Sequence, residues 1–162
     1  MRTALYPGSF DPITLGHLNI IRRASRQFDR LVVCIAVNSD KHTMFTLEQR
    51  MDFLWRSCTR FDNVEVVYTE DLVAEYCRKR GINVLVKGLR AVSDFEYEFQ
   101  IAIINKKINS DLDTLFLPAS ERYTYLSSTV VKELARYGAD IAELVPMEIR
   151  GDILKLAQAG RK

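Results

Sequence analysis

The chain has 162 residues, of which 48% are hydrophobic and 27% are charged, and its formal net charge is +2. A chain of this length fits one domain with a sizeable core, and this balance is typical of a globular protein rather than a disordered one. The small net charge gives no support to a protein that coats nucleic acid, so basic side chains matter only where they cluster at a site.

Apolar runs predict five β-strands, which alternate with helical patterns from one end of the chain to the other. Residues 31–37 are continuously apolar and rich in β-branched side chains, as expected of a parallel strand that is buried on both faces. The predicted strands are residues 3–6, 31–37, 64–68, 82–86 and 114–117.

Helical patterns fill the intervals between these strands and continue to the end of the chain. Thr46 followed by Gln49 is typical of a helix start, and Gly81 after three consecutive cations is typical of a helix end. Amphipathic helices are predicted at residues 16–28, 46–60, 71–80 and 94–108, with two further helical segments at 127–137 and 147–159.

The alternation of strands with helices of about a dozen residues predicts an α/β fold. We expect a doubly wound, five-stranded parallel sheet with right-handed crossovers and a helical C-terminal end. Because no internal repeat, low-complexity segment or linker-like change of composition interrupts the chain, we expect residues 1–162 to form a single domain.

Cysteine usage and apolar runs indicate where the protein resides. Cys34, Cys58 and Cys77 are widely spaced, which favours reduced thiols in the cytoplasm, and the sequence offers no histidine or cysteine cluster for a zinc site. The first predicted strand leaves no room for a signal peptide, and the longest apolar run has seven residues against the ~20 that span a bilayer. We expect a cytoplasmic protein that does not bind a membrane.

Residues 6–17, with the sequence YPGSFDPITLGH, join the first predicted strand to the first predicted helix. In an open α/β sheet such a junction faces a helix N-terminus, where phosphates bind. Ser9 offers a hydroxyl, and His17 falls in the first helical turn, where the positive end of the helix dipole lowers the pKa of an imidazole. A neutral histidine there donates a hydrogen bond to a phosphate oxygen, although His17 as a simple helix cap remains the alternative.

Three further segments follow predicted strands and carry groups that suit phosphates. Lys41 follows the second strand, and the run KGLR at 87–90 follows the fourth, with a glycine that lets the backbone approach a ligand. The acids at 94–98 orient a ribose or a cation, or form a solvated helix start. The run YTYLSST at 123–129 opens a helix with three hydroxyls, of which capping explains one. All four segments lie at one edge of the predicted sheet.

These groups also suggest a reaction. The sequence lacks GxxxxGK[ST], GxGxxG and GxSxG, and no positioned nucleophile or carboxylate base stands out. A phosphate monoester has its second pKa near ~6 and is mostly a dianion at neutral pH, so it attacks the α-phosphate of ATP without a general base. Catalysis then consists of alignment and charge stabilisation.

The motifs resemble those of a known family over essentially the whole chain. The run GSFDPITLGH at 8–17 resembles the T/H-x-G-H signature of the nucleotidyltransferase superfamily, and SST at 127–129 with Lys132 is similar to its C-terminal motif. More narrowly, Lys41, the run MFTLEQR at 44–50 and the run KGLRAVSDFEYE at 87–98 resemble bacterial phosphopantetheine adenylyltransferases.

The resemblance implies a Rossmann-like fold and the transfer of AMP from ATP to 4′-phosphopantetheine, which gives dephospho-CoA and pyrophosphate. It also implies Mg²⁺ held mainly through the ATP phosphates, no metal ligands from the protein, and a homohexamer. His17 is implied as the catalytic, transition-state-stabilising residue. The implied ATP-binding residues are Ser9, Phe10, His17, Gly88, Leu89, Arg90, Glu98, Tyr123, Thr124, Tyr125, Leu126, Ser127, Ser128 and Thr129. The implied acceptor-binding residues are Ser9, Lys41, Val73 and Lys87.

Four residues depart from the common family pattern. Ser9 stands where threonine is common and Tyr123 where tryptophan is often found, while Lys87 and Lys132 replace arginines and keep the charge without the bidentate fork. Two other functions remain open: an adenylyltransferase for another phosphate-bearing acceptor, and a non-catalytic nucleotide sensor. RNA binding through the arginines of the first helix is weaker, because no basic stripe continues beyond them.

Overall fold

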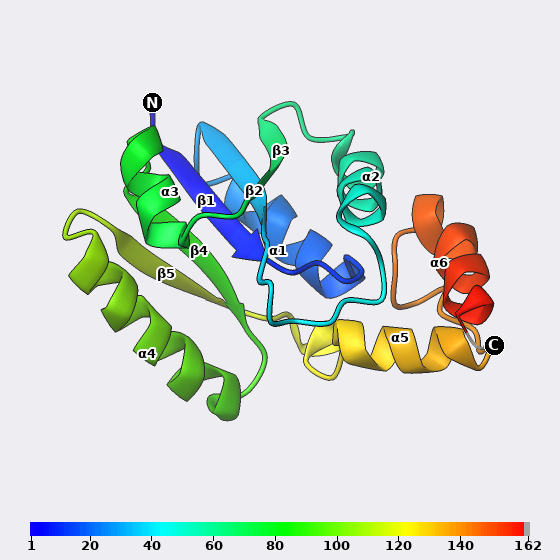
Figure 1. The fold of residues 1–162 in the computed structure, drawn as a ribbon. Coiled ribbons are helices and arrows are strands. Elements are labelled where there is room, and N and C mark those ends of the chain that lie inside the picture. The colour runs from blue at the N-terminus through cyan, green and yellow to red at the C-terminus, as the bar shows by residue number, and fades with distance from the viewer. Residues whose placement is uncertain (161–162) are drawn as a thin grey trace.

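A five-stranded parallel sheet forms the centre of the protein (Figure 1). In this computed structural model, which describes residues 1–160, the strands lie in the order β3-β2-β1-β4-β5. The last two positions of the expected 1–162 domain lie outside the described residues. The strands are β1 (Thr3–Gly8), β2 (Arg30–Ala36), β3 (Val64–Thr69), β4 (Val84–Leu89) and β5 (Asp113–Pro118). The predicted α/β fold with a doubly wound parallel sheet is confirmed.

Helices cover both faces of the sheet, and side chains alternate between the two layers. On β2, Val33 and Ile35 pack into the larger core cluster, while Val32 and Cys34 pack into the smaller one on the opposite face. This period of two explains why the strand is apolar at every position from Leu31 to Ala36. The helices are α1 (Leu15–Ser25), α2 (Leu47–Cys58), α3 (Val73–Arg80), α4 (Val92–Ile108), α5 (Ser128–Arg136) and α6 (Met147–Ala159).

The predicted helix ends of α2 and α3 are formed by the expected residues. The Thr46 hydroxyl accepts from the backbone N–H of Gln49, and the Gln49 side chain accepts from the backbone N–H of Thr46. Gly81 ends α3 in the left-handed conformation, with φ of 65°. A side-chain cap at the start of α2 and a backbone cap at the end of α3 thus set these two boundaries locally, as the sequence indicated.

Strand β4 runs from Val84 to Leu89, which corrects the prediction for residues 82–86. The N–H of Ile82 donates to the carbonyl of Cys77, so this residue still belongs to the cap of α3. At the other end the pairing with β5 continues to Leu89, opposite Pro118. Lys87, Gly88 and Leu89 therefore lie within the strand and not in a loop after it.

Helix α4 differs from the predicted amphipathic helix at 94–108. It begins two residues earlier, at Val92, and within the described chain none of its residues is buried. Apolar side chains are exposed on more than one side of it, among them Phe95, Phe99 and Ile103. The rings of Phe95 and Phe99 stack with their centroids 5.4 Å apart. Within residues 1–160, no helix combines the length and the apolar character needed to cross a bilayer.

Candidate active site

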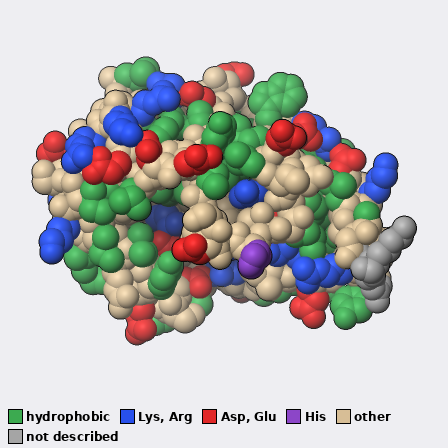
Figure 2. Space-filling view, in the orientation of Figure 1, with side chains coloured by type: hydrophobic (Ala, Val, Ile, Leu, Met, Phe, Trp, Pro, Cys, Tyr) green, Lys and Arg blue, Asp and Glu red, His purple; other side chains and the backbone are tan. Residues whose placement is uncertain are grey.

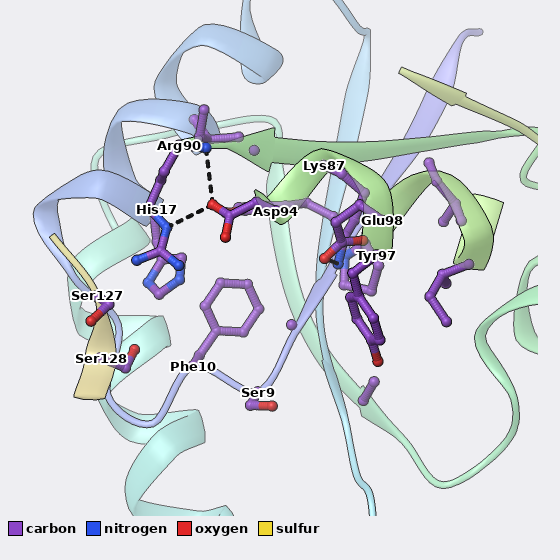
Figure 3. A pocket seen from close by; sticks show the side chains of 18 of the residues that line it. Ser9, Phe10, His17, Lys87, Arg90, Asp94, Tyr97, Glu98, Ser127 and Ser128 are labelled. Carbon is purple, nitrogen blue, oxygen red and sulfur yellow. Dashed lines mark hydrogen bonds and ion pairs between the residues drawn. The ribbon is translucent and has the colours of Figure 1, made fainter. Parts of the chain in front are cut away.

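A cavity of about 960 Å³ opens at the carboxyl edge of β1 and β4 (Figure 3). The chain runs outward from β1 to β2 on one side and later returns to β4 on the other, so the two strands flank the point where the strand order reverses. In open α/β sheets this point is where ligands bind. The volume lies near the upper end of the range for small-molecule pockets, which leaves room for two substrates.

The turn between β1 and α1 forms one wall of the cavity. Its Phe10 has a φ of 46°, which is unusual for a residue other than glycine. The Phe10 ring meets the rings of Tyr6 and His17 edge to face, with centroids 5.4 and 5.1 Å away. A Cβ on Gly8 would lie 3.0 Å from the Phe10 ring, so any larger residue here requires the ring to move. The turn thus presents Ser9 and His17 to the same cavity.

His17 is held in one tautomer by the start of its own helix. The backbone N–H of Thr14 donates to Nδ1 of His17 at 3.0 Å, and the His17 N–H donates in turn to the Thr14 hydroxyl. An Nδ1 that accepts this bond carries no proton, so the proton of the neutral ring is on Nε2. The spacing of this reciprocal cap matches that of Thr46 and Gln49 in α2.

The ring of His17 is neutral, as the sequence predicted, but the main cause differs. The surrounding protein removes water from the ring, and the positive charges of Arg90 and Lys87 add to this effect, so that the pKa of His17 falls from 6.5 to about 4. The ring is therefore uncharged at neutral pH and offers Nε2–H as a hydrogen-bond donor.

Ion pairs hold a cation of β4 and the cation that follows it against α4. Lys87 lies 3.2 Å from the carboxylate of Glu98, and Arg90 lies 3.2 Å from that of Asp94. Arg90 also donates to the carbonyl of Leu126 at 3.1 Å, which ties the end of β4 to the segment before α5. Lys41 makes a different contact, because its ammonium donates to the Ser9 hydroxyl at 3.0 Å.

The hydroxyls of Ser127 and Ser128, at the start of α5, make different contacts. Ser127 caps the helix by accepting from the N–H of Val130, whereas the hydroxyl of Ser128 donates to the carbonyl of Pro12 at 2.8 Å. One hydroxyl thus serves the helix, as the sequence predicted for capping. The second joins the helix to the β1–α1 turn.

The cavity extends from these polar groups along α4. Tyr97, Ile101 and Asn105 line this arm from one face of the helix, and Leu72 and Val73 line it from the start of α3. Figure 2 shows the surface hollowed beside α4, with Lys and Arg (blue) next to Asp and Glu (red) at the hollow. The site therefore has a charged end and a more apolar end.

The structure brings the sequence-predicted site residues to this one cavity, apart from Leu89, Thr124 and Tyr125. The predicted residues that line it are Ser9, Phe10, His17, Lys41, Val73, Lys87, Gly88, Arg90, Glu98, Tyr123, Leu126, Ser127, Ser128 and Thr129.

Other residues that line the cavity received no role from the sequence, among them Asp11, Thr14 and Asn105. The spacing of Thr14 and His17 was a capping signal for the first of the helices, and Asn105 lies two turns after Glu98 on the same helix face. No local sequence pattern indicates a role for Asp11, because the residues that bind its carboxylate are 33 to 121 residues away in the sequence.

The carboxylates of the site do not form a protein-built metal centre. Within residues 1–160, no group of three or more histidine, cysteine, aspartate or glutamate side chains is placed to hold a metal ion. Asp94 and Glu98 face the cavity, and each is already paired with a cation.

Comparisons with known proteins find a family model and curated relatives that cover most of the chain. Residues 5–134 match the cytidylyltransferase-like family. A phosphopantetheine adenylyltransferase from Clostridium tetani is 50% identical over 96% of this chain and 97% of its own length. Another from Caldanaerobacter subterraneus subsp. tengcongensis is 47% identical over 90% of this chain and 91% of its own.

A solved structure shares the fold at much lower identity. A candidate nicotinate-nucleotide adenylyltransferase from Vibrio parahaemolyticus superposes with a TM-score of 0.71 and 17% identity, over 98% of this chain and 93% of that one. At this identity the likeness supports the fold alone. The family rests on the long matches at high identity: the chain belongs to the cytidylyltransferase-like family and, within it, to the phosphopantetheine adenylyltransferases.

Proposed function

We propose that this chain transfers AMP from ATP to 4′-phosphopantetheine, giving dephospho-CoA and pyrophosphate in coenzyme A biosynthesis. The observation that carries the proposal is one cavity of about 960 Å³ that joins a charged end, with His17 and Arg90, to a more apolar arm along α4. The charged end suits a polyphosphate. The arm suits an extended acceptor that bears a single phosphate.

ATP occupies the charged end in this proposal. Nε2–H of His17 donates to the α-phosphate as negative charge develops on it, and Arg90 and the N-terminus of α5 bind the remaining phosphates. The proposed ATP-binding set is the one that the resemblance implied: Ser9, Phe10, His17, Gly88, Leu89, Arg90, Glu98, Tyr123, Thr124, Tyr125, Leu126, Ser127, Ser128 and Thr129.

The acceptor lies across Ser9, Lys41, Val73 and Lys87, with its phosphate next to the ammonium of Lys41. An oxygen of this phosphate forms a bond to the α-phosphorus of ATP, and the bond from that phosphorus to the bridging oxygen breaks to release pyrophosphate. The nucleophile is already ionised at neutral pH, so the step needs no general base. This agrees with a histidine whose Nδ1 is engaged and whose pKa is about 4.

Mg²⁺ fits this site as an ion held by the phosphates of ATP. The cavity carboxylates Asp94 and Glu98 are paired with cations, so they do not form a separate cage for the metal. When bound, the ion neutralises charge on the phosphates. Orientation of the α-phosphate remains the task of His17 and Arg90.

We also propose that the chain acts as a single nucleotidyltransferase domain in a cytoplasmic homohexamer. The exposed apolar side chains of α4 support assembly, because contiguous apolar patches on a surface mark contacts between proteins. The three cysteines are free and buried, which suits a reducing compartment.

An acceptor panel tests the proposed function. Purified protein is incubated with ATP, Mg²⁺ and one phosphate-bearing acceptor at a time, and pyrophosphate release and product mass are measured. We expect product only with 4′-phosphopantetheine. Product with another acceptor alone contradicts the acceptor, and ATP binding without pyrophosphate from any acceptor identifies a sensor.

A further inference from the structure

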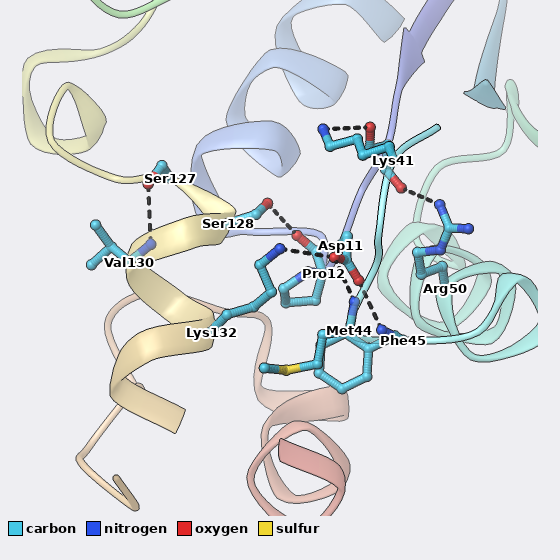
Figure 4. A network of polar contacts seen from close by, with 11 residues as sticks. Asp11, Pro12, Lys41, Met44, Phe45, Arg50, Ser127, Ser128, Val130 and Lys132 are labelled. Carbon is cyan, nitrogen blue, oxygen red and sulfur yellow. Dashed lines mark hydrogen bonds and ion pairs between the residues drawn. The ribbon is translucent and has the colours of Figure 1, made fainter. Parts of the chain in front are cut away.

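Asp11 is a buried carboxylate to which the proposed reaction assigns no task. Its side chain is 3% exposed, and it accepts hydrogen bonds from the backbone N–H groups of Met44 and Phe45, each at 3.0 Å. The ammonium of Lys132, on α5, lies 2.9 Å from the same carboxylate (Figure 4). One side chain thus joins three segments that are far apart in the sequence.

The turn that carries Asp11 is held in place from outside. Phe10 adopts a left-handed φ of 46°, which costs an ordinary residue about 1–2 kcal/mol. Arg50 donates to the carbonyl of Ser9 at 2.9 Å, and Ser128 donates to that of Pro12 at 2.8 Å. Asp11 lies between these two contacts, so its own bonds fix the middle of the turn.

The three partners of Asp11 come from opposite sides of the cavity. Met44 and Phe45 end the segment that begins with Lys41, which donates to Ser9. Lys132 lies on α5, one turn after its N-terminus, and lines the cavity itself. A displacement of this carboxylate therefore moves the acceptor-side cation and the nucleotide-side helix relative to each other.

We propose that Asp11 is a positioning residue for the transfer reaction, acting through Met44, Phe45 and Lys132 to hold the Lys41 segment and the N-terminus of α5 on the turn that presents His17. The inference rests on the proposed function. It predicts that both substrates lose alignment together when Asp11 changes, because the carboxylate is buried and both of its oxygens bind protein groups on the two sides.

The test compares Asp11→Asn with Asp152→Asn. Asp152 accepts from Arg56 at 2.8 Å and joins α2 to α6, so it is a carboxylate–cation contact between two elements away from the cavity, although Asp152 is 51% exposed. We measure kcat, KM for each substrate and the urea unfolding curve. Asp11→Asn should lower kcat by about ten- to a hundredfold and raise both KM values, since misplacement by about 1 Å has such effects. Asp152→Asn should keep all three constants.

Lys132 supplies a second comparison that keeps Asp11 intact. Lys132→Arg preserves the ion pair and should retain kcat within about threefold, whereas Lys132→Met should reproduce the loss seen for Asp11→Asn. The double variant Asp11→Asn/Lys132→Met should lose no more than the worse single variant, because both changes remove the same ion pair. If Asp11→Asn does not fold, the comparison of kcat between Lys132→Arg and Lys132→Met tests the inference by itself.

Wild-type kinetic constants in folded Asp11→Asn, even with lower stability, would overturn the inference and leave Asp11 a structural residue. Equal activity of Lys132→Arg and Lys132→Met would overturn it as well. A wild-type protein that uses another acceptor of the panel contradicts the proposed acceptor alone, and the same variant ratios are then measured on that acceptor.

Discussion

At the scale of single residues, His17 shows how the start of a helix positions and orients the proposed catalytic group. The bond from the Thr14 N–H to Nδ1 fixes the tautomer, and burial beside Arg90 and Lys87 keeps the ring neutral. A neutral imidazole donates to a phosphate without the cost of burying a charge. The same arrangement excludes His17 as a base at Nδ1.

Replacement of His17 by alanine should lower kcat by about 10²–10³-fold, as the loss of one transition-state donor does. The dissociation constant of ATP, measured by calorimetry, should change by less than about tenfold, because the donor acts mainly on charge that develops during the reaction. A wild-type kcat would contradict the catalytic role. Loss of ATP binding in proportion to kcat would make His17 a binding residue instead.

The lowered pKa of His17 also predicts how stability depends on pH. Between 6.5 and about 4 the unfolded chain binds a proton at this position that the folded chain does not, so folding weakens as pH falls through this window. His17→Gln removes the titration and keeps a side chain that suits the helix start. The stability of wild type relative to His17→Gln should fall by about 3 kcal/mol from pH 7 to pH 4.

Urea unfolding of both proteins at several pH values measures this difference. The variant is the reference for wild type, because all other titrating groups are the same in both proteins. A pH-independent difference would mean that the histidine keeps its ordinary pKa in the fold. An NMR titration of the imidazole provides a direct check.

At the scale of elements, glycine has opposite effects in two helices. Gly81 ends α3 with a φ of 65°, where any Cβ is strained although nothing lies within 4 Å. Gly151 lies inside α6 with open space around it. The first position needs glycine for its backbone, whereas the second gains nothing from it.

Gly151→Ala should therefore raise the free energy of unfolding by about 0.5–1 kcal/mol, because alanine is the better helix former. Gly81→Ala should lower it by about 1–2 kcal/mol through strain at the cap. Urea denaturation of wild type and both variants measures the two changes in the free energy of unfolding. Effects of the same sign would show that the two helix environments have been misassigned.

At the scale of the whole molecule, α4 has two distinct sides. Tyr97, Ile101 and Asn105 line the cavity. Phe95, Phe99 and Ile103 follow each other at helical spacing on another side and stay exposed. A helix that is apolar on more than one side is usually buried in a larger assembly. We therefore assign the contacts of the proposed hexamer to this exposed stripe.

Ile103→Lys should reduce the proposed hexamer to smaller species, because a lysine in an apolar contact is costly to bury. Met147→Lys is the matched control: Met147 is 76% exposed at the start of α6, and Ile103 is 55% exposed. Sedimentation or light scattering measures the mass. A hexamer that persists in Ile103→Lys, or that is lost in Met147→Lys, contradicts the assignment of this stripe.

The sequence by itself determined the fold and the edge of the sheet that carries the chemistry, because these follow from local patterns. A strand such as β2 is apolar from Leu31 to Ala36 since both faces are covered, and caps such as Thr46 and Gly81 act within a few residues. Family-like runs at 8–17, 87–98 and 127–129 indicated the site residues, which the structure brings to one cavity apart from Leu89, Thr124 and Tyr125.

Only the tertiary structure decided features that depend on distant partners. The extent of β4 follows from its register with β5 and from the cap of α3. The pKa of His17 depends first on burial and then on charges that β4 brings near. Asp11 receives its partners from residues 44–45 and from α5. Packing and electrostatics act through space, so no pattern along the chain encodes these contacts locally.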